Sequence, residues 1–392
     1  MKARSNNFDG PWLPFAVLAL LATAGGFVAM YVLNQASAVG DTALGGTALV
    51  AEVAAAVRDH LSLPAGAYRD RLAVVYLMTD MGAKGSERAE MLRLSIELLD
   101  VYLFPTTPSL VYAFTSRELV EQVASGLGAA GRLPNVLVLP LNASTGGGAG
   151  AGAGGGGGVG AAASAAQAAA AGAGAHRFVS DWRLSFVPAF AKALGHRYVL
   201  QLDHDSFVLS PPAPGGSLVQ LMEARGALLA ARSTGVAPPE ATLGLPELAR
   251  HFLVSHRLAP TQLWGFCSPP GLEGLHSRQG QGDQGAAGGK GALALPPSGG
   301  WNGSVLHGSY LAYSVDWWHS PLVSRFVQLC RAAGDSGGAS QHWTDQGVVA
   351  MLWQMLLAPQ QLHMLQFEFV HGSFEEARAK AKAVLGERGG PS

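Results

Sequence analysis

Cysteine is scarce in this sequence, and basic residues never gather into a run. The only two cysteines, Cys267 and Cys330, are too far apart for a zinc-ligand pair or a redox CxxC motif, so they form either one disulfide or two buried thiols. The 26 Lys and Arg residues against 27 Asp and Glu residues give a formal net charge of -1. Without a basic patch or an aromatic-interleaved basic stripe, the chain lacks the signature of nucleic-acid binding, and we expect no nucleic-acid partner.

Hydrolase motifs receive little support from the sequence. It contains no HExxH zinc-binding motif, and its one match to GxSxG, Gly334 to Gly338, follows the predicted helix Pro321–Ala332 instead of joining a strand to a helix as a nucleophile elbow does. A membrane-anchored hydrolase, using Asp203, Asp205 and scattered histidines as metal ligands or using a serine nucleophile, therefore ranks last among the functions considered.

The first long stretch without charge runs from Pro11 to Leu33. About 20 apolar residues are enough to cross a bilayer, so this stretch is predicted to span a membrane. Lys2 and Arg4 precede it, which predicts a cytoplasmic tail over residues 1–10 and a type II orientation with the rest of the chain lumenal. The competing interpretation is a signal peptide cleaved after Ala36-Ser37-Ala38, but the apolar run is longer than a usual signal-peptide core.

Two candidate N-glycosylation sequons agree with a lumenal domain. Asn142-Ala143-Ser144 and Asn302-Gly303-Ser304 both fit the pattern N-x-[ST]. The pattern is short and occurs by chance, but it gains weight on a lumenal face. Together with the predicted span, it places the chain in the secretory pathway.

Beyond the span, apolar runs of strand length alternate with segments that carry apolar residues at helical spacing. The predicted strands are Leu72–Met78, Leu110–Phe114, Val136–Leu139, Tyr198–Leu202, Ser309–Val315 and Leu362–Phe369. The predicted helices are Ser86–Leu103, Arg117–Ala124, Trp182–Leu194, Pro321–Ala332 and Thr344–Leu357. This alternation predicts βαβ units, a parallel sheet and an α/β fold.

Composition divides the rest of the chain into segments. Residues 34–67 are rich in small side chains and are predicted as a stem, and residues 68–380 as one lumenal domain. Two low-complexity stretches, 145–175 and 271–300, are so rich in Gly that they lack side chains for a core, and we predict them as insertions in that domain. Residues 381–392 are predicted as a flexible tail.

The most informative local pattern is Asp203-His204-Asp205 at the end of the apolar strand Tyr198–Leu202. Ligands of open α/β sheets bind beyond the carboxyl ends of the strands. Two carboxylates there can hold a hard divalent cation, which bridges the phosphates of a nucleotide diphosphate and neutralises charge on the leaving group. The alternative is a pair of solvated aspartates in a loop, because the tripeptide alone is common.

Several segments resemble glycosyltransferase family 15, the fungal-type α-1,2-mannosyltransferases. Residues 178–209 resemble its helix and strand before the acidic motif, which is Glu-Pro-Asp in that family. Gly308 through Ser320, preceded by Trp301-Asn302, resembles its acceptor-side strand. The segment from Gln341 through Val349, then Pro359, Leu362-His363-Met364 and Phe369-Val370-His371, is similar to its Trp-x-Asp helix start, its Pro-containing turn and a strand that ends on a metal-contacting histidine. Order and spacing agree over about half of the chain, although few identities do.

The resemblance implies a GT-A-like (Rossmann-like) nucleotide-diphospho-sugar transferase fold behind the membrane span. It implies Mn²⁺ or another divalent cation, GDP-mannose or another nucleotide sugar as donor, retention of configuration, and a glycan or glycoprotein acceptor. The expected protein is therefore a hexosyltransferase, more narrowly an α-mannosyltransferase, in the Golgi or ER membrane. The alternative is a non-catalytic type II membrane protein of the same fold that binds glycan or nucleotide.

The resemblance also carries roles onto single residues. Asp203 and Asp205 become the ligands of the metal and of the donor diphosphate, with His371 as a late metal ligand, although an ordinary hydrogen-bonded histidine at a strand end is the alternative there. Asp345 becomes a catalytic candidate, although a carboxylate at a helix start also fits a simple dipole interaction. Trp343 and Tyr310 become substrate-binding candidates, although large aromatic side chains belong more often to a core.

One position departs from the family. Its acceptor strand carries a carboxylate, proposed as a nucleophile or as a stabiliser of the oxocarbenium ion, where this chain has Leu311. A leucine can serve in neither role. Either the alignment slips there, or the acceptor attacks on the same face while the leaving diphosphate accepts its proton, or the protein does not turn over.

Overall fold

A computed structural model describes residues 44–64, 66–78, 85–116, 119–127, 133, 135–141, 178–267, 300–336 and 343–388. The predicted span Pro11–Leu33, the sequon at Asn142 and the two predicted insertions, except Gly300, lie outside these residues. Among the helices that the structure describes, none is at once long enough and apolar enough to cross a membrane. The described residues thus belong to the segments predicted as stem, lumenal domain and tail.

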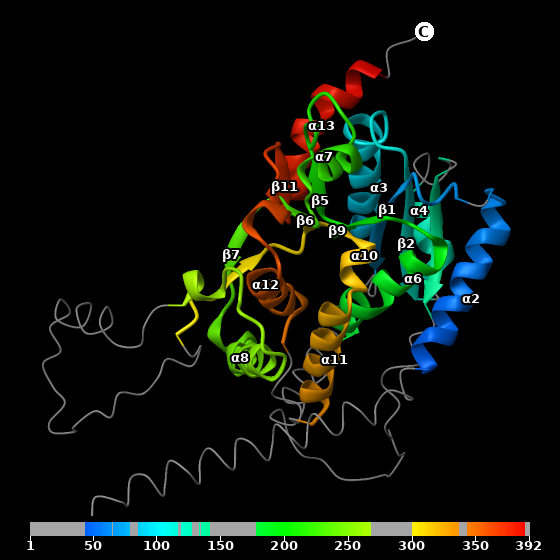
Figure 1. The fold of residues 1–392 in the computed structure, drawn as a ribbon. Coiled ribbons are helices and arrows are strands. Elements are labelled where there is room, and N and C mark those ends of the chain that lie inside the picture. The colour runs from blue at the N-terminus through cyan, green and yellow to red at the C-terminus, as the bar shows by residue number, and fades with distance from the viewer. Residues whose placement is uncertain are drawn as a thin grey trace, which may run out of the picture.

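A seven-stranded sheet, in the order β10-β6-β9-β4-β1-β2-β3, lies at the centre of the described part of the chain (Figure 1). The strands are β1 (Leu72–Met78), β2 (Ser109–Ser116), β3 (Val136–Leu141), β4 (Tyr198–Leu202), β6 (Leu229–Ala231), β9 (Tyr310–Ser314) and β10 (Leu362–Met364). Strands β3, β2, β1 and β4 pair in parallel, and so do β6 and β10. The predicted α/β fold with parallel strands is confirmed for these pairs.

Strand β9 departs from the predicted parallel arrangement, because it runs antiparallel between β4 and β6. After β6 the chain enters β7 (Thr234–Val236), which pairs antiparallel with β8 (Ser304–Leu306) in a separate two-stranded sheet. Because β7 follows the carboxyl end of β6, the chain reaches β9 from that edge and runs back through the sheet. The residues that lead into β9 therefore lie near the carboxyl end of β4.

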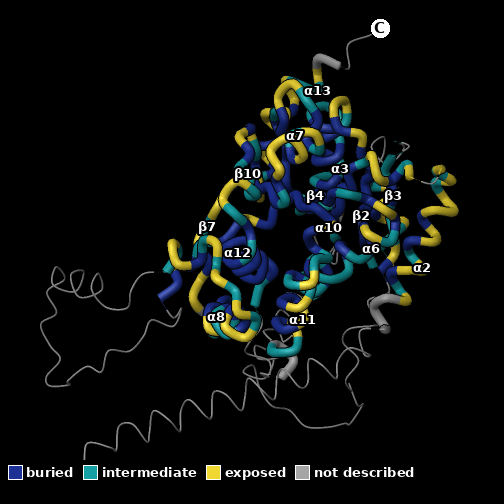
Figure 2. Tube along the Cα trace, in the orientation of Figure 1, coloured by how far each residue is buried: buried dark blue, intermediate teal, exposed yellow. Residues whose placement is uncertain are grey.

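Helices cover both faces of the sheet and bury its strands (Figure 2). The strands share one apolar core with α2 (Leu44–Leu61), α6 (Val187–Leu194), α8 (Leu245–Ser255), α11 (Pro321–Ser336) and α12 (Asp345–Leu356), and a second core with α3 (Gly85–Tyr102), α4 (Val120–Leu127) and α7 (Leu218–Arg225). Along β9, Leu311 and Tyr313 face the first core, whereas Tyr310 and Ala312 face the second. Successive side chains of a strand point to opposite faces of the sheet, so alternate residues of β9 belong to the same core.

The predicted strand Leu362–Phe369 is two strands in two sheets. Strand β10 ends at Met364, and β11 (Phe369–His371) pairs antiparallel with β5 (Ser206–Val208). Between them the backbone N–H of Leu365 donates to the carbonyl of Ala231, and the N–H of Glu368 donates to Ser210 Oγ. These bonds turn the chain from the sheet edge toward β5, a change of direction that an apolar run does not reveal.

Two segments at the ends of the described chain are more ordered than their composition suggests. Helix α2 lies within residues 34–67, the predicted stem, and buries Val50, Ala54 and Val57 at helical spacing against α6. Helix α13 (Phe374–Arg388) packs against α3 and reaches into the predicted tail 381–392. Small apolar side chains spaced along one helix face are enough for close packing against a neighbouring helix.

Both cysteines are free thiols. Cys330 is buried in α11, and burial raises the pKa of its thiol. Cys267 is half-buried and forms an isolated β-bridge with Trp301. Of the two alternatives left by the sequence, the structure has two separate thiols.

Candidate functional site

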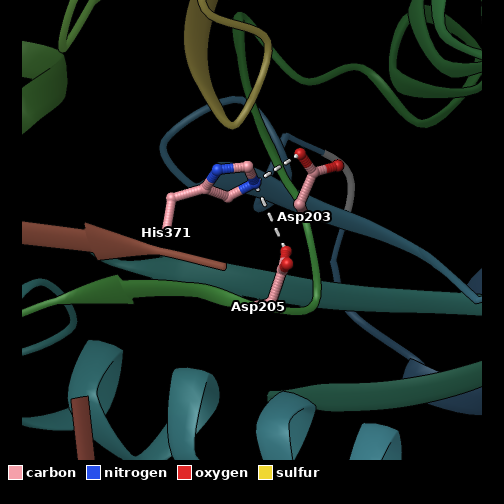
Figure 3. A group of neighbouring side chains, drawn as sticks. All are labelled: Asp203, Asp205 and His371. Carbon is pink, nitrogen blue, oxygen red and sulfur yellow. Dashed lines mark ion pairs between the residues drawn. The ribbon is translucent and has the colours of Figure 1, made fainter. Parts of the chain in front are cut away.

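Asp203 and Asp205 lie where β4 passes into β5, at the carboxyl edge of the sheet (Figure 3). His371, the last residue of β11, reaches the same place because β11 pairs with β5 and sets His371 opposite Ser206. The backbone N–H of Gly372 donates to the carbonyl of Asp205 at 3.2 Å and holds the two segments together. The structure thus unites the three residues that the sequence analysis grouped as metal ligands.

The three side chains point toward one another (Figure 3). His371 Nε2 lies 3.3 Å from Asp203 Oδ2 and 3.4 Å from Asp205 Oδ1. One ligand atom from each residue lies within 4.8 Å of the others. Both aspartates are half-buried and His371 is exposed, so a solute can reach the group from solvent.

Buried hydroxyl groups fix the backbone just after the acidic pair. Tyr76 of β1 and Ser95 of α3 share a hydrogen bond of 2.8 Å, and Ser95 Oγ donates to the carbonyl of Ser206 at 2.5 Å. The hydroxyl of Ser206 in turn donates to the carbonyl of Ser309, just before β9, at 2.8 Å. The turn that carries Asp205 is therefore anchored to β1, α3 and β9.

The charges in the group stabilise one another in the absence of a metal. Burial opposes ionisation of both aspartates, but the hydrogen bonds from His371 hold the pKa of Asp203 and of Asp205 below the usual value, and the charge of Arg183 adds to this at Asp203. The same hydrogen bonds from Asp203 and Asp205 raise the pKa of His371 to about 10. At neutral pH the metal-free group thus holds two carboxylates and one imidazolium.

Arg183 links the acidic pair to a third carboxylate, a link that the sequence analysis missed. Its Nη2 forms an ion pair with Asp203 Oδ1, and its Nη1 lies 3.0 Å from Asp345 Oδ2. The side chain is only 11% exposed, and although burial disfavours its charge, Asp345 and Asp203 raise the pKa of the guanidinium. The available signal was an arginine between Trp182 and Leu184, at the start of the predicted helix Trp182–Leu194.

The remaining predicted site residues have different surroundings. Asp345 begins α12, where it pairs with Arg183 and its backbone N–H donates to Ser180 Oγ, so it lies beside the acidic motif. Trp343 is half-buried, and its Nε1 donates to the carbonyl of Leu243 at 2.7 Å.

Tyr310 is a core residue rather than a surface that a sugar can touch. Its side chain is 1% exposed, and its ring packs against Phe367 and Phe369 at centroid distances of 4.9 and 6.0 Å. Its position on β9 turns it toward the face covered by α3, α4 and α7. A substrate-binding role for Tyr310 therefore does not fit this arrangement.

Solved structures share this architecture at low sequence identity. Core-mannan synthase A from Aspergillus fumigatus, in a form with Mn and GDP, matches with a TM-score of 0.56 and 11% identity over 79% of this chain and 77% of that one. The mannosyltransferase Ktr4p from S. cerevisiae matches with a TM-score of 0.56 and 12% identity over 83% of this chain and 80% of that one. The chain has the fold of these mannosyltransferases.

A further structure of the S. cerevisiae mannosyltransferase Ktr4p, in complex with GDP, matches with a TM-score of 0.53 and 11% identity over 79% of this chain and 72% of that one. No protein-family model matches the sequence, and no curated protein matches it either. The resemblance to glycosyltransferase family 15 is thus a remote one that appears in the fold. The GT-A-like fold predicted for the lumenal domain agrees with these neighbours.

The chemistry of the three side chains fits a divalent cation. Two carboxylates and an imidazole are oxygen and nitrogen ligands suited to such ions, and three protein ligands leave positions open for oxygens of a nucleotide diphosphate. The imidazole must lose its proton before it can coordinate, which links metal binding to pH.

The affinity of this group for a divalent cation is expected to rise with pH between 7 and 8.5, by roughly tenfold per pH unit, because a cation bound by all three side chains would displace the proton of His371. Calorimetric titration with Mn²⁺ across that range measures the slope. The folding stability of the metal-free protein changes with pH in the opposite direction. The raised pKa of His371 stabilises the fold fully below the unfolded value near 6.5, and this contribution is lost as the pH rises through about 10. His371→Ala is the control, because it should remove the slope. An equal slope in that variant would contradict His371 as a ligand.

Proposed function

We propose that the chain is a metal-dependent glycosyltransferase that moves mannose from GDP-mannose onto a glycan or glycoprotein acceptor. The observation that carries this function is the convergence of Asp203, Asp205 and His371 at the carboxyl edge of the sheet, in a fold shared with mannosyltransferases that were solved with GDP. Ligand binding at this edge is the rule for α/β sheets of this kind.

The side chains of the site have different roles in donor binding. Asp203, Asp205 and His371 would hold the cation, with Mn²⁺ as the proposed ion. When bound, a divalent cation neutralises the charge that grows on the leaving diphosphate. Arg183 pairs with both Asp203 and Asp345 and so balances negative charge beside the cation site from the protein side.

The acceptor side has no carboxylate on β9. Leu311, at the position where the resemblance places one, is 3% exposed and belongs to the core under α6 and α12. A covalent glycosyl intermediate on that residue is therefore impossible. We propose same-face attack by the acceptor hydroxyl, with a diphosphate oxygen of the leaving group taking its proton, which retains the anomeric configuration without a protein nucleophile.

Leu311 also favours a second candidate function, a protein of this fold that binds a nucleotide sugar or glycan without transferring the sugar. In that case the Asp203, Asp205 and His371 group would still bind GDP with a metal, but GDP-mannose would remain intact. Binding alone does not separate the two functions. Release of GDP from GDP-mannose does.

A donor screen on the purified chain tests the proposed function. GDP-mannose, GDP-fucose and the common UDP-sugars are each incubated with Mn²⁺, and nucleotide release is measured with and without EDTA. The expected result is GDP release from GDP-mannose that EDTA stops. GDP binding without release favours the second candidate, and the absence of any metal-dependent binding of guanine nucleotides contradicts both.

We also propose that the chain is a single-pass type II protein of the Golgi or ER membrane. The supporting observation is the uncharged stretch Pro11–Leu33 behind Lys2 and Arg4. The chain is then expected to stay in the membrane pellet after carbonate extraction, with its C-terminus protected from protease in intact vesicles. A soluble product that begins near Val39 would establish cleavage after Ala38 instead.

A further inference from the structure

The backbone and the guanidinium of Arg183 both bind to the segment that carries the acidic motif. It lies on η4 (Trp182–Phe186), a single turn of π-helix that leads into α6, and such turns occur frequently at functional sites. Its backbone carbonyl accepts a hydrogen bond of 3.1 Å from Gln201 Nε2. Gln201 is on β4, two residues before Asp203, whose carboxylate pairs with the Arg183 guanidinium.

The guanidinium leaves one oxygen of Asp203 for a cation. Asp203 Oδ1 pairs with Arg183 Nη2, whereas Asp203 Oδ2 faces His371 Nε2 at 3.3 Å. Among the ion pairs of the described residues, Asp205 is paired with His371 and not with an arginine. The rigid planar fork of an arginine can hold two carboxylates in defined orientations, which the single charge of a lysine cannot do equally well.

Gly308 packs closely against this guanidinium. It lies in the stretch between β8 and β9, and a Cβ built on it would come 3.1 Å from Arg183 Nη1 and 3.4 Å from Asp345 Oδ2. Its φ is not in the left-handed region, so alanine is acceptable to the backbone there. The ion pair between Arg183 and Asp345 therefore packs against bare backbone, and a single methyl group would press on it.

We propose that Arg183 is a positioning residue that orients Asp203 for coordination through one oxygen and ties this ligand to Asp345 at the start of α12. The role of Arg183 rests on the metal site of the proposed function. It contacts a ligand of the cation rather than the cation, so its loss should weaken metal binding without removing a ligand. Groups that orient metal ligands typically contribute 10–100-fold to metal affinity.

Mn²⁺ titration of the purified full-length chain tests the positioning role. Arg183→Gln is expected to lower Mn²⁺ affinity by about 10–100-fold. Arg183→Lys should recover part of that loss, because its one charge can pair with Asp203 but cannot also hold Asp345 in the same geometry. The gain in thermal midpoint at one fixed Mn²⁺ concentration should shrink most in Arg183→Gln and less in Arg183→Lys. This comparison does not depend on the midpoint of each variant without metal. A merely structural ion pair would change the metal-free midpoint alone.

Gly308→Ala is the second variant, for the case that Arg183→Gln does not fold. It removes no charge, and its added methyl group presses on Arg183 Nη1, so Mn²⁺ affinity should fall by several-fold. Gly216→Ala is its control, because nothing lies within 4 Å of a Cβ at that position. Arg331→Gln is the control for the loss of an arginine side chain. Arg331 Nε forms an ion pair of 3.3 Å with Asp181 Oδ1 at the surface, and Asp181 is only two residues before Arg183.

The outcomes separate the positioning role from the metal site itself. A folded Arg183→Gln variant that binds Mn²⁺ as tightly as the unaltered chain overturns the role of Arg183 only. If that variant does not fold, unchanged Mn²⁺ affinity in Gly308→Ala overturns it in the same way. If the unaltered chain does not bind Mn²⁺, the proposed metal site fails, and the role of Arg183 fails with it.

Discussion

Replacing Asp205 with asparagine is expected to abolish metal-dependent binding of GDP while leaving the fold intact. Asparagine keeps the shape of the side chain but removes a negative charge from a group in which Asp205 Oδ1 lies 3.4 Å from His371 Nε2. Hard divalent cations depend on the charge of their oxygen ligands, so a loss on the order of 100-fold or more is expected. Calorimetric titration of GDP with and without Mn²⁺ measures it, and circular dichroism reports the fold.

Asp59→Asn is the matched control for the loss of a carboxylate, because Asp59 is exposed on α2 and should not change GDP binding. His371→Ala should weaken GDP binding less than Asp205→Asn, since both carboxylates remain. If Asp205→Asn binds GDP with undiminished, metal-dependent affinity, the acidic motif is a solvated turn. The proposed glycosyltransferase would then have no metal centre.

Leu311→Ala is expected to cost about 2–5 kcal/mol of stability and to change Mn²⁺ affinity by no more than about threefold. Leu311 is 3% exposed on β9, where its backbone lies between Gln201 of β4 and Ala231 of β6. Truncating a leucine there leaves a cavity that a central strand, hydrogen-bonded on both edges, cannot close by relaxing. Urea denaturation without metal measures the stability, and Mn²⁺ titration measures the site.

Val254→Ala is the comparison for loss of an apolar side chain, because Val254 is 78% exposed on α8 and should change stability by less than about 0.5 kcal/mol. An opposite result for Leu311→Ala, with unchanged stability and lost donor turnover, would show that the leucine lies against the substrate. Same-face attack without a protein group on β9 would then need to be reconsidered.

The sheet could largely be predicted because its strands are continuous apolar runs. Leu72–Met78 and Tyr198–Leu202 are strands over the residues predicted for them, since both faces of the sheet are covered and neither face needs polar side chains. The acidic motif was predictable for the same reason, as its position follows from the end of β4. His371 was reached through the family resemblance and not through any local pattern.

Other features depend on contacts between segments that are distant in the sequence. The antiparallel course of β9 follows from the pairing of β7 with β8, and these three-residue strands have no clear periodicity. Helix α2 was predicted as stem because its small side chains carry little signal until α6 is present to cover them. The role of Arg183 depends on its contacts with Asp203 and Asp345, which lie 20 and 162 residues away in the sequence.

The pairing of β5 with β11 makes the proposed metal site of Asp203, Asp205 and His371 a late product of folding. Asp205 and His371 are 166 residues apart in the chain (371 − 205), so a nascent chain that has just exposed the acidic motif still lacks its third ligand. The group can assemble only after the intervening residues have been made and β11 has closed a loop of that length onto β5. A chain that binds the cation through all three ligands is therefore one whose domain has been synthesised through β11 and has folded.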